Sequence, residues 1–504
     1  MPTQKDLKSR TLDKDLDRIG FVGDAAEAMG RRLIGPALAI IFLALCAAAA
    51  ASATHVFSTS VSGALVLISA SVIGGYLALN IGANDVANNV GPAVGAKVMS
   101  LTLALVLAAI CESAGALLAG GEVVSTVSGS ILSPYNVADN ASFTRAMLTA
   151  MAASALWINF ATLIGAPVST THSIIGGVVG AGIAVGGFAA INWTTISTIA
   201  LTWILSPVLG GLVAAALMAF INSRVIYSGD TLNAARFWLP VLLGLTGAVF
   251  AGFIFFKTTD RLSVLPDWIA AVLSVTIGVC VWWFYRKVVR AQSVDLENST
   301  RSLRLLFSVP LMVTAALLSF AHGANDVANA IGPLAAIVFS QSGNFTDLSY
   351  WFIGKLNPEV PLWVSAVGAF GISAGLLLFG RRLVTVVGKK ITKLSPIRAF
   401  CITLATAATV LGASSLGLPV SSTHIAVGAV FGVGFYREWY NNRYIPDAGR
   451  PKRRKLLRNR EERRRILLVR RANLVTIVAA WVVTVPASGI LALFLYRLLT
   501  LLIT

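Results

Sequence analysis

The sequence predicts an all-α polytopic membrane protein of about 12–13 transmembrane helices arranged as two inverted repeats. Three observations support this fold class: the composition, a series of long apolar stretches, and a pair of polar motifs that occurs twice. Of the 504 residues, 56% are hydrophobic and 12% are charged, and the mean hydropathy is +0.78. A soluble particle of this size would need far more polar surface, so the chain belongs in a bilayer.

Apolar stretches long enough to cross a bilayer follow one another along almost the whole chain. The two that begin near Pro167 and Pro419 have a second interpretation, as re-entrant hairpins that touch only one side of the membrane. The expected spans lie at about 33–53, 63–82, 100–120, 146–165, 168–190, 194–222, 237–256, 268–285, 303–322, 361–379, 399–417, 419–436 and 473–497.

Basic residues are concentrated in a few segments between the apolar stretches, which sets the orientation. With a cytosolic N-terminus, these segments all face the cytosol, as the positive-inside rule requires. The segments 54–62, 186–193 and 340–360 then face outside, and Lys355 is their one basic residue. The basic segments are 224–236, 286–304, 381–398 and the Arg-rich loop 437–471.

The termini and the charge exclude several classes of protein. Residues 1–30 are too long and too acidic for a signal peptide, so we expect a cytosolic tail. The net charge of +18 lies in loops, which indicates topogenic signals and no nucleic-acid partner. The loop 437–471 has a second interpretation, as a binding segment for anionic lipid or a regulator. The four scattered cysteines indicate neither a metal site nor a disulfide framework.

Two polar motifs occur once in each half of the chain, in the same order. Residues 82–92 (GANDVANNVGP) return as 323–333 (GANDVANAIGP), and residues 167–174 (PVSTTHSI) return as 419–426 (PVSSTHIA). Such long matches indicate a duplicated unit. An odd number of spans separates the copies, so the repeats are predicted to be inverted. Inverted repeats are typical of transporters that work by alternating access.

The duplication also predicts the domain organisation. Pro92 and Pro333 are expected to break or kink the helices that carry the first motif. The predicted segments are the tail at 1–30, an extra N-terminal transmembrane helix at 31–58, a first inverted repeat at 59–222, linking helices at 223–302, and a second inverted repeat at 303–504.

The first motif places a carboxylate and several amides on one side of a helix, at i,i+3 and i,i+4 spacing. Hard oxygen ligands suit a sodium ion, and a buried carboxyl group suits a proton. The alternative is that these side chains only join helices by hydrogen bonds. The predicted coupling-ion residues are Asn84, Asp85, Asn88, Asn325, Asp326 and Asn329, with Asp85 and Asp326 as metal ligands if the cation is a metal ion.

The second motif supplies hydroxyls where a short helix begins, and such helix starts bind oxyanions. The alternative is simple N-capping. Neither motif core contains Lys or Arg, so neutral donors would hold the anion loosely enough to release it. An anion beside two aspartates costs several kcal/mol per uncompensated charge, so cations must accompany it, which favours symport. The hydroxyls are Ser169, Thr170, Thr171, Ser421, Ser422 and Thr423.

Three further polar residues have two interpretations each. His172 and His424 either relay protons and contact an anion, or orient the neighbouring hydroxyls. Glu112 has no acidic counterpart, because Ile372 stands at the matching position of the second half. It is either a second coupling acid or a hydrogen-bonding residue in helix packing.

Both motifs, with their copies, closely resemble the signatures of the PiT inorganic phosphate transporter family, of the bacterial low-affinity phosphate permease type, over roughly residues 60–500. The resemblance implies a carrier with two hairpins meeting at the centre and a bacterial inner-membrane location. It assigns inorganic phosphate to the six hydroxyls above. It assigns the driving cation to Asp85, Asn88, Asp326 and Asn329.

The resemblance leaves the coupling cation open between H⁺ and Na⁺, with no other cofactor. Sodium-driven members tend to carry membrane glutamates in both halves. Here Ile372 stands at the position that matches Glu112, and Thr403 stands before the second hydroxyl motif where an acid would be expected. Proton coupling, or transport of a neutral metal-phosphate, is therefore favoured slightly. By family analogy a homodimer is one candidate assembly.

Other functions remain as alternatives. A sulfate or other tetrahedral-oxyanion permease is the nearest, although phosphate can donate a hydrogen bond to a carboxylate and sulfate cannot. A cation channel would show a polar stripe along several helices, and a nutrient sensor would use the same site without transport. No nucleophile motif, metal-ligand spacing or nucleotide loop indicates an enzyme.

Overall fold

The protein is helical throughout the part of the chain that its structure, a computed structural model, describes. The described residues are 33–57, 60–132, 137, 139–166, 168–262, 266–341, 360–390, 394–444 and 471–503. Within them the one β-type contact is an isolated bridge between Leu132 and Ile191. The predicted tail 1–30 and most of the Arg-rich loop 437–471 lie outside the described residues, as does most of the segment 340–360.

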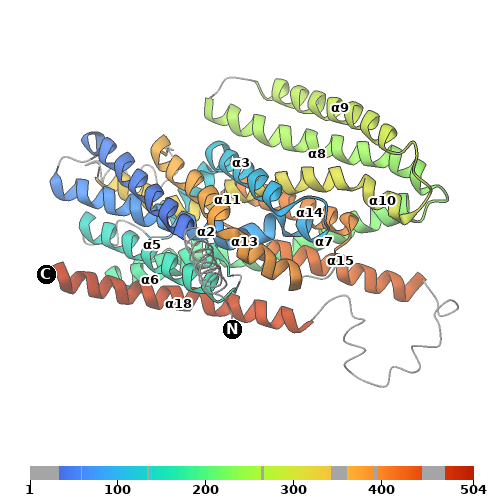
Figure 1. The fold of residues 1–504 in the computed structure, drawn as a ribbon. Helices are drawn as coiled ribbons and strands as arrows, with labels where there is room; N and C mark the ends of the chain where they lie inside the picture. Colours follow the sequence, from blue (N-terminus) through green and yellow to red (C-terminus); the bar gives the residue numbers. More distant parts are fainter. Residues whose placement is uncertain are drawn as a thin grey trace, which may run out of the picture.

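The long helices run roughly alongside one another and form a single bundle (Figure 1). The bundle begins with the helix Leu33–Phe57. The other long helices are α2 (Val61–Gly95), α3 (Leu101–Ala119), α5 (Asn140–Leu163), α6 (Thr170–Gly186), α7 (Trp193–Ile221), α8 (Thr231–Leu262), α9 (Asp267–Gln292), α11 (Ser308–Gln341), α13 (Leu362–Lys390), α14 (Pro396–Ser415), α15 (Ser422–Tyr444) and α18 (Arg471–Ile503). Short helical turns add α4 (Gly121–Ser125), η1 (Thr126–Ser130) and α10 (Thr300–Leu306).

The all-α, polytopic membrane fold predicted from the sequence is confirmed. Ten of the described helices are long and apolar enough to cross a membrane, or eleven if the bent pair α10–α11 is one span. The expected spans near 168–190 and 419–436 are not among them, and α6 has only 17 residues. Both α6 and α15 begin at the buried hydroxyl motifs inside the bundle, which favours the hairpin interpretation.

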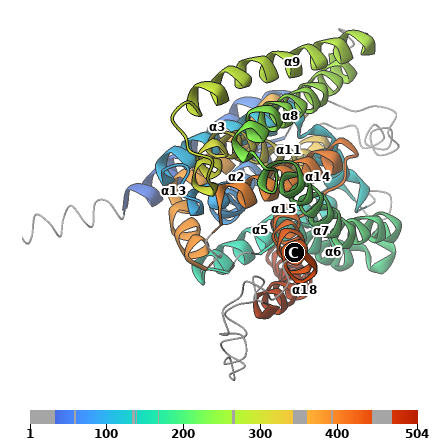
Figure 2. The same cartoon turned by 90° about the vertical axis from the view of Figure 1, so that its right-hand side faces the viewer.

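The two halves of the chain interleave. The helix α2 packs on α13, α3 on α11, α6 on α18, and α7 on α15, so each pair joins the first half to the second. The helices α8 and α9 pack on each other at one side of the molecule, with α18 at the opposite side (Figure 2). The linking helices therefore lie outside the interleaved bundle.

Glycines allow these helices to approach closely at matched positions. A Cβ on Gly82 would lie 1.9 Å from the carbonyl oxygen of Ile372, and a Cβ on Gly323 would lie 2.0 Å from that of Glu112. Gly82 and Gly323 are the same position of the two motifs, and Glu112 and Ile372 are likewise matched. The motif helices thus contact the opposite halves in the same way.

This approach predicts a stability effect. Gly323→Ala forces α11 away from the backbone of α3, and we expect it to lower the free energy of unfolding by about 1–3 kcal/mol, as overpacking does. The matched control is Gly412→Ala, because a Cβ there meets nothing within 4 Å. Thermal unfolding of the purified protein in detergent compares them. Equal unfolding temperatures would show that α3 and α11 do not touch there.

Of the break or kink expected at the two prolines, the break is wrong. Pro92 lies inside α2 and Pro333 inside α11, which continues to Gln341. Proline fixes φ at a helical value and removes only one backbone donor, so a buried helix with strong neighbours can continue through it. The polar centre is therefore built on unbroken helices that meet the starts of two others.

Asp139 caps α5 at the end of the bundle near Ser340. Its carboxylate accepts the backbone N–H of Ser142 at 2.6 Å, which holds the pKa of Asp139 below its ordinary value of 3.8. A lowered pKa stabilises the folded state above pH 3.8, and the effect disappears as the pH falls through the folded value.

We therefore expect Asp139→Ala to cost about 1 kcal/mol of stability at neutral pH, as the loss of an N-cap does. The cost should persist down to the ordinary carboxyl pKa and vanish in stronger acid. Unfolding temperatures of both proteins measured along a descending pH series test this. A difference that is constant through strong acid would contradict the ionised cap.

Candidate functional site

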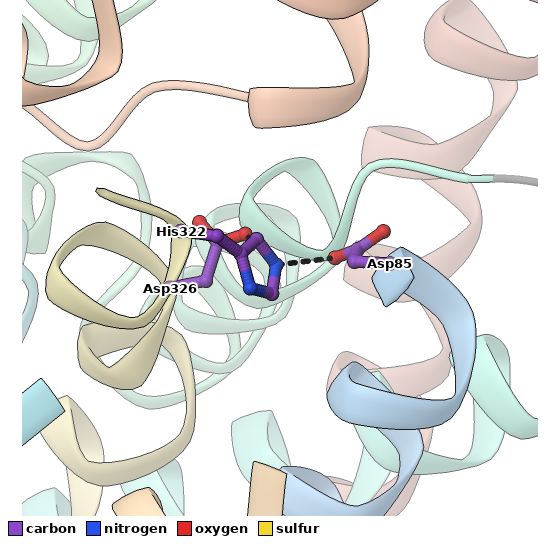
Figure 3. Close-up of side chains that lie close together, drawn as sticks. All are labelled: Asp85, His322 and Asp326. Atoms are coloured by element: carbon purple, nitrogen blue, oxygen red, sulfur yellow. Dashed lines mark ion pairs between the residues drawn. The ribbon is translucent and has the colours of Figure 1, made fainter. Parts of the chain in front are cut away.

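Two aspartates from the two halves meet in the centre of the bundle. Asp85 lies on α2 and Asp326 on α11, each 1% exposed. Figure 3 shows both carboxyl groups directed toward one imidazole, that of His322. The starts of α6 and α15 reach the same point, because their first residues bond to these acids. The sequence therefore folds both motifs of both halves into one site.

The hydroxyls of the second motif donate to the aspartates at matched positions. Thr170 Oγ1 donates to Asp85 Oδ2 at 2.9 Å, and Ser422 Oγ donates to Asp326 Oδ2 at 3.1 Å. Thr423 Oγ1 also lies 3.3 Å from Asp85 Oδ1. Each hairpin tip is thus joined to the acid of its own half, and Thr423 crosses to the acid of the other half.

The amides of Asn88 and Asn329 add two further hydrogen bonds between the two halves of the chain. Asn88 Nδ2 donates to Thr423 Oγ1 at 2.8 Å, and Asn329 Nδ2 donates to Thr171 Oγ1 at 3.0 Å. Thr171 Oγ1 donates in turn to the carbonyl oxygen of Val420 at 3.0 Å. Asn88 and Asn329 therefore each hold the start of the second-motif helix of the opposite half.

Asn84 and Asn325 occupy the edge of the site. The Asn84 amide lies 2.9 Å from Thr162 Oγ1, and its reversed orientation also brings its N–H₂ 3.3 Å from Asp85 Oδ1. Asn325 Nδ2 donates to Ser414 Oγ at 3.0 Å. Asn84 thus joins α2 to α5, and Asn325 joins α11 to α14.

Ser169 and Ser421 take the capping role that was the alternative interpretation. Their hydroxyls accept the backbone N–H of His172 and His424 at 3.2 and 3.3 Å. His172 Nδ1 also contacts Ser169 Oγ at 2.7 Å, and its ring stacks on Trp203 at 3.7 Å. His172 therefore orients the cap of α6, and it lies beside a cavity that is lined mostly by apolar side chains.

The central residue that the sequence analysis missed is His322. Its Nε2 lies 2.8 Å from Asp326 Oδ2 and 3.7 Å from Asp85 Oδ2, and its Nδ1 lies 3.3 Å from Glu112 Oε1. The ring is fully buried. Its signal in the sequence is a difference between the copies, because Ile81 precedes the first motif where His322 precedes the second.

Two further residues without a polar counterpart, Glu112 and Asn89, extend from this imidazole. Asn89 Nδ2 donates to Glu112 Oε1 at 2.7 Å, and the same oxygen faces His322. The matching positions carry Ala330 and Ile372, which are apolar. Three polar residues with apolar counterparts in the other half, Asn89, Glu112 and His322, thus gather in one buried network beside the matched residues of the site.

The charge of the site demands cations or protons. Three carboxyl groups and one imidazole are buried together, and an uncompensated buried charge costs several kcal/mol. Asp85, His322 and Asp326 each offer one ligand atom, all within 4.8 Å of one another, so one metal ion fits among them. Carboxylate oxygens suit sodium, whereas an imidazole nitrogen suits a transition metal better.

The bundle and its buried, duplicated polar centre are those of a multi-pass membrane protein of the transporter type. The chain belongs to the phosphate transporter family, whose pattern it matches over residues 81–492. This confirms the resemblance noted in the sequence.

Individual relatives cover most of the chain. A Helicobacter pylori protein named "Putative phosphate permease" is 45% identical over 414 residues, which are 82% of this chain and 76% of the relative. A Pyrococcus abyssi protein, also named as a phosphate permease, is 32% identical over 86% of this chain and 98% of its own. A solved structure named "The sodium-dependent phosphate transporter" superimposes with a TM-score of 0.74 at 31% identity, covering 87% of this chain and 99% of that one.

Proposed function

We propose that the protein imports inorganic phosphate by cation-coupled symport through alternating access. The observation that carries the proposal is the direct bonding of the hairpin hydroxyls to the two buried aspartates, at matched positions of both halves. Phosphate entering between these groups exchanges hydroxyl–carboxylate bonds for hydroxyl–phosphate bonds. The released carboxylates then bind the cation that compensates the charge of phosphate. The names of the relatives support phosphate as the substrate.

The proposed roles follow the geometry. Thr170, Thr171, Ser422 and Thr423 contact phosphate, while the caps Ser169 and Ser421 present the helix starts. Asp85, Asn88, Asp326 and Asn329 hold the cation, which we propose to be Na⁺ or H⁺. The sodium dependence in the name of the solved relative supports sodium. The metal-fitting group with His322 supports the metal-phosphate variant, with Asp85 and Asp326 as ligands.

The two halves, 59–222 and 303–504, are proposed to be inverted repeats, which the matched contacts of the motif helices support. We also propose a bacterial cytoplasmic-membrane location, a cytosolic N-terminus, and transport without covalent chemistry. A homodimer is the proposed assembly.

Uptake of labelled phosphate into proteoliposomes tests the function. A sodium gradient and a pH gradient are imposed separately, with unlabelled sulfate as competitor and added divalent metal as a third condition. Uptake driven by one gradient and resistant to sulfate is the expected result, and it identifies the cation. Absence of uptake under every condition, or equal suppression by sulfate, would contradict phosphate symport.

A further inference from the structure

A second polar site lies far from the aspartates, where α2 ends and where α10 and α14 begin; α10 is at the right-hand end of Figure 1. A cavity of about 490 Å³ opens there. Four cationic side chains from three separate segments line it: Lys97, Arg301, Arg304 and Arg398. The proposed topology places this end on the cytosolic side.

The four cations lack acidic partners. No acidic residue lines the cavity, and none of the four forms an ion pair with any acid in the described part of the chain. Arg437 and Arg304 instead repel Arg398. Like charges that line one cavity repel one another, and an anion bound among them would offset this repulsion.

The backbone also favours a retained cation at this place. Lys97 has φ 59°, the one non-glycine residue with positive φ among those described. Glycine adopts this conformation at lower cost. A lysine at this position therefore indicates that its cationic side chain is needed there. Ser395, the N-cap of α14, lies in the same cavity and accepts a bond from Arg398 Nε at 3.1 Å.

Topogenic charge alone does not account for this arrangement. The positive-inside rule requires basic residues in cytosolic loops, but not their convergence on a cavity. Arginine guanidinium groups bind phosphate oxygens in pairs, and basic pockets between membrane helices bind lipid phosphate groups. We propose that this cavity binds a phosphate-bearing anion, either dissolved in the cytosol or carried by an anionic lipid headgroup.

A bound anion would connect the ends of α2 and of α10–α11, the segments that carry the two aspartates. Lys97 lies two residues beyond the end of α2, which carries Asp85, and Arg304 lies on α10, which leads into α11 with Asp326. A bound anion would therefore hold the ends of both motif helices together and favour one arrangement of the carrier. The binding itself does not depend on the proposed transport function.

The test compares Lys97→Gln/Arg304→Gln with the matched control Arg290→Gln, which removes an exposed arginine of α9 outside the cavity. Because Lys97 and Arg304 are exposed, the double variant should fold, and gel filtration verifies it. Native mass spectrometry measures binding of phosphatidylglycerol against phosphatidylcholine, and calorimetry measures binding of pyrophosphate.

We expect the double variant to bind one of these probes at least about tenfold more weakly, with no change in the control. A loss confined to phosphatidylglycerol identifies the lipid, and a loss confined to pyrophosphate identifies the dissolved anion. Absence of binding in the wild type, or equal binding by both variants, would overturn the proposal. Phosphate uptake is not used as a readout, so failure here is distinct from failure of the transport proposal.

Discussion

Asp326→Asn reduces phosphate uptake to about a hundredth of the wild-type rate or less. The substitution keeps the size of the side chain but removes the charge that faces His322 at 2.8 Å and accepts from Ser422 at 3.1 Å. Removing one partner of a buried charged pair costs about 3–5 kcal/mol, which corresponds to roughly a hundredfold or more. Initial rates of labelled phosphate uptake in proteoliposomes measure the effect.

The control for this variant is Asp295→Asn, which removes an exposed aspartate after α9. We expect its uptake to equal that of the wild type. The unfolding temperature of each protein separates loss of function from loss of fold. Uptake above half the wild-type rate in Asp326→Asn would exclude Asp326 from the transport site.

His322→Ala should have an effect of comparable size, because it removes the group that separates three buried carboxyl groups. We expect both uptake and the unfolding temperature to fall, since Asp85, Asp326 and Glu112 lose their shared partner. Adding Glu112→Gln to His322→Ala removes one of these acids. The double variant should therefore recover part of the lost stability.

Recovery of stability in the double variant would show that Glu112 and His322 interact, because the effects of the two substitutions would then not be additive. The control is His55→Ala, in the helix Leu33–Phe57 away from the site, which should change uptake less than about twofold. Strictly additive losses for Glu112→Gln and His322→Ala would mean that the two side chains do not interact. A normal uptake rate in His322→Ala would remove His322 from the site.

The duplicated motifs explain why much of this site could be predicted. Residues that occur twice, such as Asp85 with Asp326 and Thr170 with Ser422, stand out in the sequence and meet in the structure. His322 could not be found in the same way, because it lies next to a motif and has no polar counterpart in the other half. A search for residues that occur in both halves does not reveal such a position. A comparison for differences would have found Asn89, Glu112 and His322 together.

Other features needed the fold itself. Whether Ser169 binds a ligand or caps a helix depends on the direction of its hydroxyl, and both uses require the same residue after the same proline. The pairing of α2 with α13 and of α6 with α18 depends on contacts between long apolar faces that resemble one another in composition. The helix continuing through Pro333 depends on neighbours that hold it.

The interleaving of the halves has a consequence for biosynthesis. The helix α6 leaves the ribosome long before its partner α18, which begins at Arg471 near the end of the chain. At about 5–20 residues per second, the wait is roughly 15–60 s. During this time the glycine-lined faces of the first half rest against lipid, where their backbone hydrogen bonds stay satisfied within each helix. The α6–α18 pair can therefore form only after Arg471–Ile503 has been synthesised, and a chain truncated before α18 should be left exposed to membrane proteases.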